Sequence, residues 1–164
     1  MIYPGFLLLI FVSGLIGSIN AQKRDYIIDE DFKGRVIIVE SQCGEVPPIK
    51  QERLQFKIPE NGVYFFNGEL KSGVIDENYY YRQPNGKLVK IRGYFSKDEI
   101  DKSDSLSAEH LVGVFGGSFG TYGNDGNNFL IKYFETNKNY SERSTWKQNN
   151  TQDEFIRDFK LNCK

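Results

Sequence analysis

Apolar and polar residues alternate along much of the chain, and this alternation predicts β-strands. The segment Leu54–Ile58 has the period-two pattern of a strand with one buried face. Tyr79–Arg82 and Lys87–Ile91 flank Asn85-Gly86, a pair that supplies the positive φ angles a tight hairpin turn requires. Further β-branched or aromatic runs predict strands at Tyr26–Ile28, Val36–Val39, Val63–Phe66, Leu111–Phe115 and Phe129–Phe134.

The end of the chain follows a helical period instead. Thr151-Gln152-Asp153-Glu154 has the spacing of a capping box, and Phe155 and Phe159 then recur at a helical interval. We therefore expect a short amphipathic helix over Gln152–Leu161 that packs both rings on the sheet. About seven or eight short strands with one terminal helix predict an all-β fold, either a sandwich-like domain or an open barrel.

The first residues have the character of an export signal. Met1–Ala21 carries no charged side chain and contains the apolar run Phe6–Val12. Polar residues at Ser18 and Asn20 then precede the small Ala21, which indicates cleavage before Gln22. The sequence therefore predicts a signal peptide over residues 1–21 and a single mostly β domain over residues 22–164.

An uncleaved membrane anchor is the alternative for this segment. No Lys or Arg precedes the apolar run, and the segment is barely long enough for the roughly twenty residues that a membrane helix needs. Lys23 and Arg24 follow directly, and with an uncleaved anchor they would keep the rest of the chain in the cytoplasm. Cleavage is favoured, so we expect a chain exported to the periplasm, cell surface or medium, with no transmembrane segment in its mature form.

The chain has two cysteines, Cys43 and Cys163. In an oxidising compartment an even number of cysteines indicates a disulfide, and two permit one intramolecular pairing. Such a bridge ties the C-terminus to a loop near the start of the domain and stabilises it by up to about 4–5 kcal/mol on the chain-entropy model. Two free thiols, or an intermolecular bond, are the alternatives.

Charge and composition narrow the classes of partner. The formal net charge is −1 and no cluster of Lys and Arg is present, which argues against binding of nucleic acid. The 13 Phe, 10 Tyr and 16 Gly residues are typical of strands and turns rather than of a helical bundle. We expect no cofactor, and a monomer.

Several of these segments together resemble a known family. Phe32–Val36, Cys43-Gly44, Ile58-Pro59 with Asn61–Val63, and Tyr79–Tyr81 resemble a family of small exported bacterial domains of unknown function, over roughly residues 26 to 135. The resemblance implies export and a mostly β domain, and it implies no activity. The order of strands, Asn-Gly turn and tyrosine-rich strand is also similar to prealbumin-like sandwiches, by analogy of fold.

One short motif suggests catalysis. Gly116–Gly120 matches the G-x-S-x-G pattern of a nucleophile elbow, which places its serine, here Ser118, on a sharp turn from a strand into a helix. The following residues Thr121–Gly126 cannot begin a helix. The single histidine, His110, precedes Ser118, whereas in α/β-hydrolases the histidine comes last. A glycine-rich β-turn or bulge is the better interpretation.

Other polar groups have simpler explanations than a metal site. Four acidic residues lie close together, but they lack calcium-loop spacing, so a solvated charged loop is favoured: Asp98, Glu99, Asp101 and Asp104. Sequons begin at Asn139 and Asn149, and they matter where the host glycosylates exported chains. We predict no catalytic, cofactor-binding or metal-binding residue.

Two surfaces remain as candidates for binding. Tyr79 and Tyr81 lie on one face of a predicted strand, so they either offer a flat stacking surface to a sugar or a protein, or belong to the core, which is favoured. The loop Cys43–Lys50 is a second candidate, because Pro47, Pro48 and the predicted bridge would pre-organise it.

We therefore predict an exported, non-catalytic binding or structural module whose partner is a protein or a glycan. No acid, base and nucleophile converge in the sequence, which is the main argument against an enzyme. The alternatives are a secreted hydrolase that uses Ser118 or a carboxylate pair such as Glu40 with Glu45, and a secreted inhibitor or partner-binding protein that uses the loop Cys43–Lys50.

Overall fold

The computed structural model describes residues 21–71, 75–94, 99, 113–122, 129–137 and 146–163. Apart from Ala21, the predicted signal peptide lies outside them. Within the described residues the chain forms nine strands and one helix: β1 (Gln22–Asp29), β2 (Gly34–Glu45), β3 (Ile49–Lys50), β4 (Arg53–Lys57), β5 (Val63–Phe66), β6 (Ile75–Arg82), β7 (Leu88–Tyr94), β8 (Gly113–Tyr122), β9 (Phe129–Asn137) and α2 (Trp146–Asn162).

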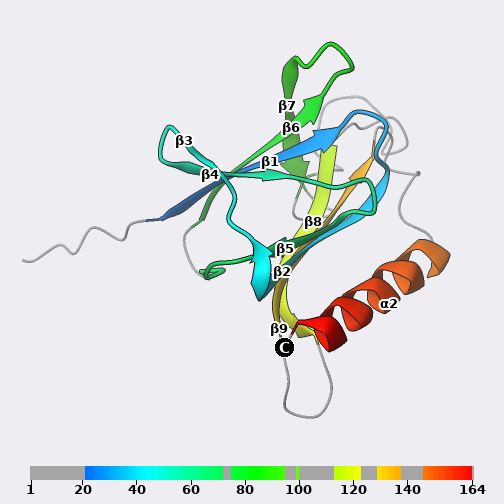
Figure 1. Ribbon diagram of the computed structural model, residues 1–164. Coiled ribbons are helices and arrows are strands. Elements are labelled where there is room, and N and C mark those ends of the chain that lie inside the picture. Colours follow the sequence, from blue (N-terminus) through cyan, green and yellow to red (C-terminus); the bar gives the residue numbers. More distant parts are fainter. Residues whose placement is uncertain are drawn as a thin grey trace, which may run out of the picture.

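All nine strands belong to one mixed sheet with the order β3-β4-β1-β6-β7-β8-β9-β2-β5. The sheet curls into a half-barrel, so that strands from its two ends approach each other (Figure 1). The ring of Phe56 in β4 lies 5.3 Å from the ring of Tyr64 and 5.2 Å from that of Phe66, both in β5. The predicted all-β fold with a terminal helix is confirmed, and its architecture is a curled half-barrel.

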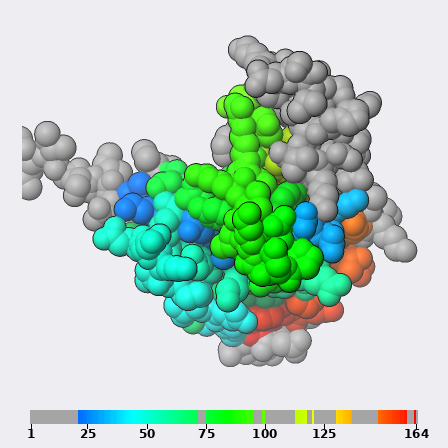
Figure 2. All heavy atoms as spheres, turned by 90° about the horizontal axis from the view of Figure 1, so that it is seen from above, coloured from blue at the N-terminus to red at the C-terminus, as the bar shows by residue number. Residues whose placement is uncertain are grey.

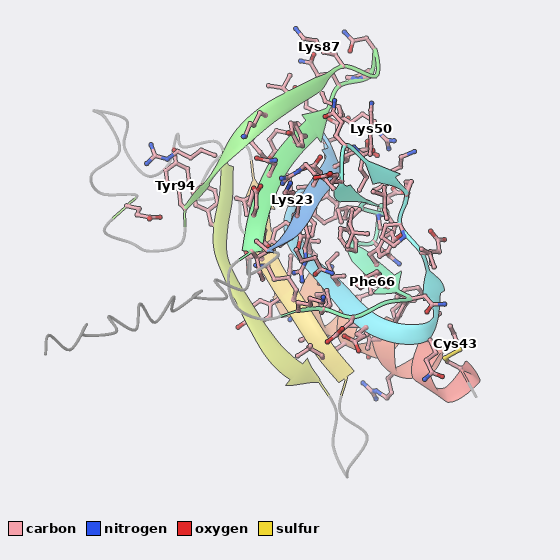
Figure 3. All side chains as sticks on the ribbon, turned by 90° about the vertical axis from the view of Figure 1, so that its left-hand side faces the viewer. Lys23, Cys43, Lys50, Phe66, Lys87 and Tyr94 are labelled. Atoms are coloured by element: carbon pink, nitrogen blue, oxygen red, sulfur yellow. A yellow bond between two sulfur atoms is a disulfide. The ribbon has the colours of Figure 1, made fainter. Side chains whose placement is uncertain are left out.

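Aromatic side chains fill the inside of the curve (Figure 3). Alternate residues of each strand point inward, as the pleat requires. The ring of Tyr26 lies 5.4 Å from Phe56, 5.3 Å from Tyr79 and 5.0 Å from Phe134. Each of these side chains is at most 3% exposed. The strand propensity of Phe and Tyr in the sequence is therefore used for core packing.

Helix α2 covers the outer face of the sheet over β2, β5 and β9 (Figure 1). Ile156 packs there with Ile37, Val39, Val63 and Ile131, which are buried residues of the three strands. The ring of Phe159 stacks on Phe65 with centroids 3.4 Å apart, and Phe155 lies 5.7 Å from the same ring. The prediction that Phe155 and Phe159 pack on the sheet is confirmed.

The helix begins at Trp146, six residues before the predicted start at Gln152. Arg35 of β2 explains the difference, because it donates hydrogen bonds to the carbonyl oxygen of Asn149 (3.0 Å), to Oε1 of Gln152 (3.0 Å) and to Oδ1 of Asp153 (2.7 Å). Gln152 in turn donates to the carbonyl oxygens of Arg35 and Asn61. These tertiary contacts hold the first turns of the helix, which the capping-box spacing does not reveal.

Cys43 and Cys163 form a disulfide with their Cα atoms 5.9 Å apart, which confirms the predicted intramolecular pairing. Figure 3 shows the bridge beside the end of α2. Cys43 is exposed near the end of β2, and Oγ of Ser41 lies 3.5 Å from Sγ of Cys163. The bridge therefore fastens the C-terminal helix to the strand that it covers.

Replacing both cysteines, as Cys43→Ser with Cys163→Ser, should lower the free energy of unfolding by up to about 4–5 kcal/mol. The bridge spans a sequence separation of 120 residues, so its loss frees a long loop in the unfolded chain. Chemical denaturation measures the change, and reduction of the wild-type chain should reproduce it. Equal stability of the oxidised wild type and the double variant would contradict this account.

Candidate functional site

The most exposed apolar side chains among the described residues lie between β2 and β4. Val46 is 71% exposed and Ile49 is 70% exposed, whereas Pro47 between them is buried. We call residues 46–52 the apolar tip. Single exposed apolar side chains are common on protein surfaces. Two of them within a short segment form a patch, and such patches mark contact sites.

The chain turns back at the apolar tip through a strained hairpin. Lys50 pairs with Arg53, so the turn consists of Gln51 and Glu52. Their φ angles are 51° and 61°, the left-handed values that a two-residue type I′ turn requires and that Asn-Gly adopts most readily. Neither Gln nor Glu is suited to this conformation, and such residues persist only where the surrounding structure fixes them.

Arg53 fixes the base of this hairpin to the rest of the sheet. It donates to Oδ1 of Asp25 (2.5 Å) and Oδ2 of Asp76 (2.6 Å), and to the carbonyl oxygens of Arg24 (2.8 Å) and Asp76 (3.0 Å). The hydrogen bond from Arg53 lowers the pKa of Asp76 below its usual value, so the pair is ionised at neutral pH. The exposed ion pair of Lys23 with Glu52 (3.1 Å) adds a weaker tie at the turn.

The opposite end of the apolar tip is fixed by the backbone and the disulfide. Asn67 donates its N–H to the carbonyl oxygen of Glu45 (2.9 Å), and Gln55 donates to that of Pro48 (2.9 Å). A Cβ atom on Gly44 would lie 2.5 Å from the carbonyl group of Phe65, so only glycine permits this close approach of β2 to β5. The tip is thus held on both sides while Val46 and Ile49 face water.

A second polar cluster lies inside the half-barrel. The carboxylate of Glu77 accepts hydrogen bonds from Lys132 (2.9 Å), Tyr26 (3.0 Å) and Tyr79 (2.7 Å), and Nη1 of Arg24 lies 3.7 Å from it. The side chains of Arg24, Glu77 and Lys132 are 0%, 9% and 5% exposed. We call these three residues with the two tyrosines the ionic layer.

Burial, followed by the negative charge of Glu77, raises the pKa of both Tyr26 and Tyr79 far above the usual value. Both hydroxyl groups therefore remain protonated and donate to the carboxylate. Arg24 also donates to Oε1 of Gln22 and to the carbonyl oxygen of Lys71 (3.0 Å), which places the segment after β5 at the end of the barrel. Enclosed in this way, the ionic layer is suited to holding strands together.

Clefts also indent the surface. One of about 630 Å³ lies between the turn after β1, the turn after β4 and the β6–β7 turn. Figure 2 shows the β6–β7 hairpin in green on this face, with residues near the start of β2 in light blue beside it. A cleft of about 350 Å³ lies between α2 and the turns after β1 and β4, and another of about 550 Å³ adjoins Cys163.

Tyr79 and Tyr81, the possible binding surface, lie in the core, which is the interpretation that the sequence favoured. Tyr79 is 3% exposed and Tyr81 is 5% exposed, and the Tyr81 hydroxyl lies 2.9 Å from Oγ1 of Thr136. Both rings lie on the inward face of β6, because alternate residues of a strand share one face. This strand pairs with β1 on one edge and with β7 on the other. An outward stacking surface at Tyr79 and Tyr81 is therefore ruled out by their burial.

Ser118 lies within strand β8 rather than on a turn into a helix. The register of β8 with β9 shifts between Phe115 and Ser118, and the glycines between them have φ angles of 69° and 149°. The strand then continues to Tyr122, so the bulge interpretation is confirmed. Of the carboxylate pair, Glu40 accepts the N–H of Leu70 (2.8 Å) and Glu45 is exposed.

Some of the remaining candidate residues from the sequence lie within the described part of the chain and others lie outside it. Asn149 lies in the first turns of α2, and its carbonyl oxygen accepts from Arg35. Outside the described residues lie Asp98, Asp101, Asp104, His110 and Asn139. Across the described ranges, no three His, Cys, Asp or Glu side chains are placed to hold a metal ion, and no helix there is long and apolar enough to cross a membrane.

Sequence reasoning missed the ionic layer, although a signal for it exists. Arg24, Glu77 and Lys132 each stand two residues before an aromatic residue of the core, namely Tyr26, Tyr79 and Phe134. The same period-two rule that turns the aromatic residues inward also turns the charges inward. No sequence signal predicted the strained hairpin, because Gln51-Glu52 is not a recognised turn sequence.

Comparison with known proteins places the chain in a family without an assigned activity. The model of a family described as "Family of unknown function (DUF6843)" matches residues 20–145. Among solved structures, the one described as "Putative Lipoprotein from Bacillus anthracis" is similar in fold, with a TM-score of 0.55 and 15% identity over 87% of this chain and 95% of that one. No curated protein matches the sequence.

Removing the charge at the centre of the ionic layer, as Glu77→Gln, should lower the free energy of unfolding by about 3–5 kcal/mol, because it leaves buried cations without their carboxylate. Denaturation by urea measures this. Glu52→Gln is the matched control, since its ion pair is exposed and worth at most about 1 kcal/mol. Similar losses in the two variants would refute a central role for Glu77.

Replacing the strained turn by Gln51→Asn with Glu52→Gly should raise the free energy of unfolding by about 1–2 kcal/mol, because Asn-Gly adopts positive φ at little cost. The β6–β7 connection is a longer turn, in which the Gly86 N–H donates to the carbonyl oxygen of Gln83 and Gly86 has a φ of 80°, so it also uses glycine for its left-handed position. Thermal denaturation gives the change. A destabilised double variant would show that the Gln51 and Glu52 side chains hold the turn themselves.

Proposed function

The chain belongs to the DUF6843 family, and we propose that it is an exported, non-catalytic module that binds a partner protein through the apolar tip. The observation that carries the proposal is the exposure of Val46 and Ile49 on a segment that is fixed at both ends. A rigid recognition segment loses little conformational entropy on binding, so most of its contact energy contributes to affinity.

Export is supported by two findings. The disulfide between Cys43 and Cys163 is a bond that persists in oxidising compartments and is rare in the cytosol. The similar solved structure is described as a "Putative Lipoprotein", and lipoproteins are exported proteins. Both agree with the charge-free apolar leader in the sequence.

A protein partner is favoured over a glycan by the chemistry of the apolar tip. Val46 and Ile49 carry no hydrogen-bonding groups and no aromatic ring on which a sugar could stack. Aliphatic side chains gain free energy chiefly by leaving water for an apolar cleft. The cleft of about 630 Å³ remains a secondary surface, lined by both acidic and basic side chains.

The test is capture of a partner from the native envelope or medium by the exported chain. The double variant Val46→Ser with Ile49→Ser should lose about 2–4 kcal/mol of binding free energy, or about 30- to 700-fold in affinity, at about 1–2 kcal/mol for each partly buried aliphatic side chain. Leu88→Ser with Val89→Ser is the matched control, because those residues are 43% and 38% exposed on another hairpin.

The expected result is a protein that wild type and control recover equally and the tip variant does not. Quantitative mass spectrometry of the eluates measures the ratio. Unfolding curves of the three chains should agree closely, because the substituted side chains are exposed. Recovery of the same proteins by all three chains, or of none by wild type, would refute the proposal.

A further inference from the structure

We propose that the outer face of β4, β1 and β6 binds a saccharide, with Tyr80 at the centre of the site. This site is distinct from the apolar tip, and it goes beyond the proposed function. Tyr79 and Tyr81 point into the core, so Tyr80 between them points to the opposite face of the sheet. Its side chain is partly exposed there, because α2 covers other strands, namely β2, β5 and β9 (Figure 1). The ring therefore offers a surface for stacking against the C–H face of a sugar.

A row of polar side chains crosses the same three strands next to Tyr80. Gln55, Asp25 and Asn78 are register partners in β4, β1 and β6. Asn78 stands two residues before Tyr80, so the row and the ring share one face of the sheet. Neighbouring strands lie about 4.8 Å apart, which gives the row a length of about 10 Å. The row is thus long enough to meet more than one hydroxyl group of a sugar that stacks on the ring.

This row keeps hydrogen-bonding capacity that the fold does not use. Asp25 is only 7% exposed, and its Oδ1 accepts from Arg53 (2.5 Å) and from Asn78 (3.1 Å). Within the described part of the chain, no hydrogen bond reaches its Oδ2 or the side-chain oxygens of Gln55 and Asn78. Burial, followed by the negative charge of Asp25, raises the pKa of Tyr80, so its hydroxyl stays protonated at neutral pH. A fixed carboxylate between two amides provides the acceptors and donors that sugar hydroxyl groups require.

Other classes of ligand fit this face less well. Ile27, the register partner of Tyr80 in β1, is 6% exposed, so the described residues leave no apolar patch here of the kind that marks a protein contact. Asp25 and Asp76 both pair with Arg53, so their charges build no large field of one sign that would attract a nucleic acid or an anionic lipid. A ligand with many hydroxyl groups and an apolar ring face matches both the aromatic ring and the polar row.

The first experiment tests binding with defined probes. The exported chain is applied to immobilised oligosaccharides of glucose, galactose, mannose and N-acetylglucosamine, and to cell-wall glycan purified from the native cells. We expect retention on at least one of these probes and competition by the same sugar in solution. Amide chemical shifts in NMR spectra should then change chiefly in β1, β4 and β6 when that sugar is added. Retention on none of the probes, or shifts that cluster elsewhere, would overturn the inference.

The second experiment measures how variants bind the retained sugar. Tyr80→Ala should lower affinity about tenfold because the stacking ring is lost, whereas Tyr80→Phe keeps the ring and should retain most of the affinity. Tyr133→Ala is the matched control, since Tyr133 is 40% exposed on β9 and should not contribute. Gln55→Ala removes an amide of the row without touching the ring, and it should also weaken binding. Unfolding curves check that each variant is folded. Equal affinity of Tyr80→Ala, Gln55→Ala and Tyr133→Ala would contradict the assignment.

The saccharide site and the apolar tip can be tested separately. The variant Val46→Ser with Ile49→Ser should bind the sugar as tightly as wild type, and Tyr80→Ala should still recover the protein partner. Loss of sugar binding in the tip variant, with binding retained in Tyr80→Ala, would assign the sugar to the apolar tip and overturn this inference. Failure to capture a protein partner would leave the sugar measurements unchanged and would count against the proposed function alone.

Discussion

Contacts across the inside of the half-barrel, between β6 and β9, set the curvature on which the rest of the structure depends. Two strands separate β6 from β9 in the sheet, yet three successive inward residues of β6 touch β9. Glu77 binds Lys132, the ring of Tyr79 lies 5.2 Å from Phe134, and the hydroxyl of Tyr81 lies 2.9 Å from Oγ1 of Thr136. Polar contacts at both ends of an aromatic contact fix the distance between the strands more narrowly than apolar packing alone, because buried hydrogen bonds tolerate little change in length.

The position of the apolar tip follows from this curvature. Curling brings β4 near β5, so Phe56 of β4 packs on Tyr64 and Phe66 of β5. The outer face of β2 and β5 receives α2, and the disulfide holds the helix end there. Arg53 fastens the hairpin to β1 and β6 on the other side. Each support of the tip is therefore attached to a strand whose place the β6–β9 contacts determine.

Local patterns in the sequence predicted the elements, whereas contacts between distant residues decided what the patterns could not. Period-two alternation located Leu54–Ile58 and Tyr79–Arg82, and Asn85-Gly86 located a turn, because each signal is read within a few residues. The predicted start of α2 was wrong because Arg35, more than a hundred positions away in the sequence, binds the first turns of the helix. The exposure of Val46 could not be predicted, because it depends on whether another segment covers it. The disulfide was predictable because two cysteines allow a single pairing.

The apolar tip combines two features that cost the isolated domain free energy. Left-handed φ angles at Gln51 and Glu52 cost about 1 kcal/mol or more each, and Val46 and Ile49 gain little from the hydrophobic effect because most of each side chain faces water. Arg53 and the paired prolines add rigidity to the same segment, although a flexible loop would serve equally well as a connection between β2 and β4. A rigid segment with exposed apolar side chains favours binding to a second surface. The conformational entropy of ordering the segment has already been lost during folding, so it does not reduce the affinity. The proposed binding of a partner would account for the strain, the rigidity and the exposure together, whereas a purely connecting role for residues 46–52 accounts for none of them.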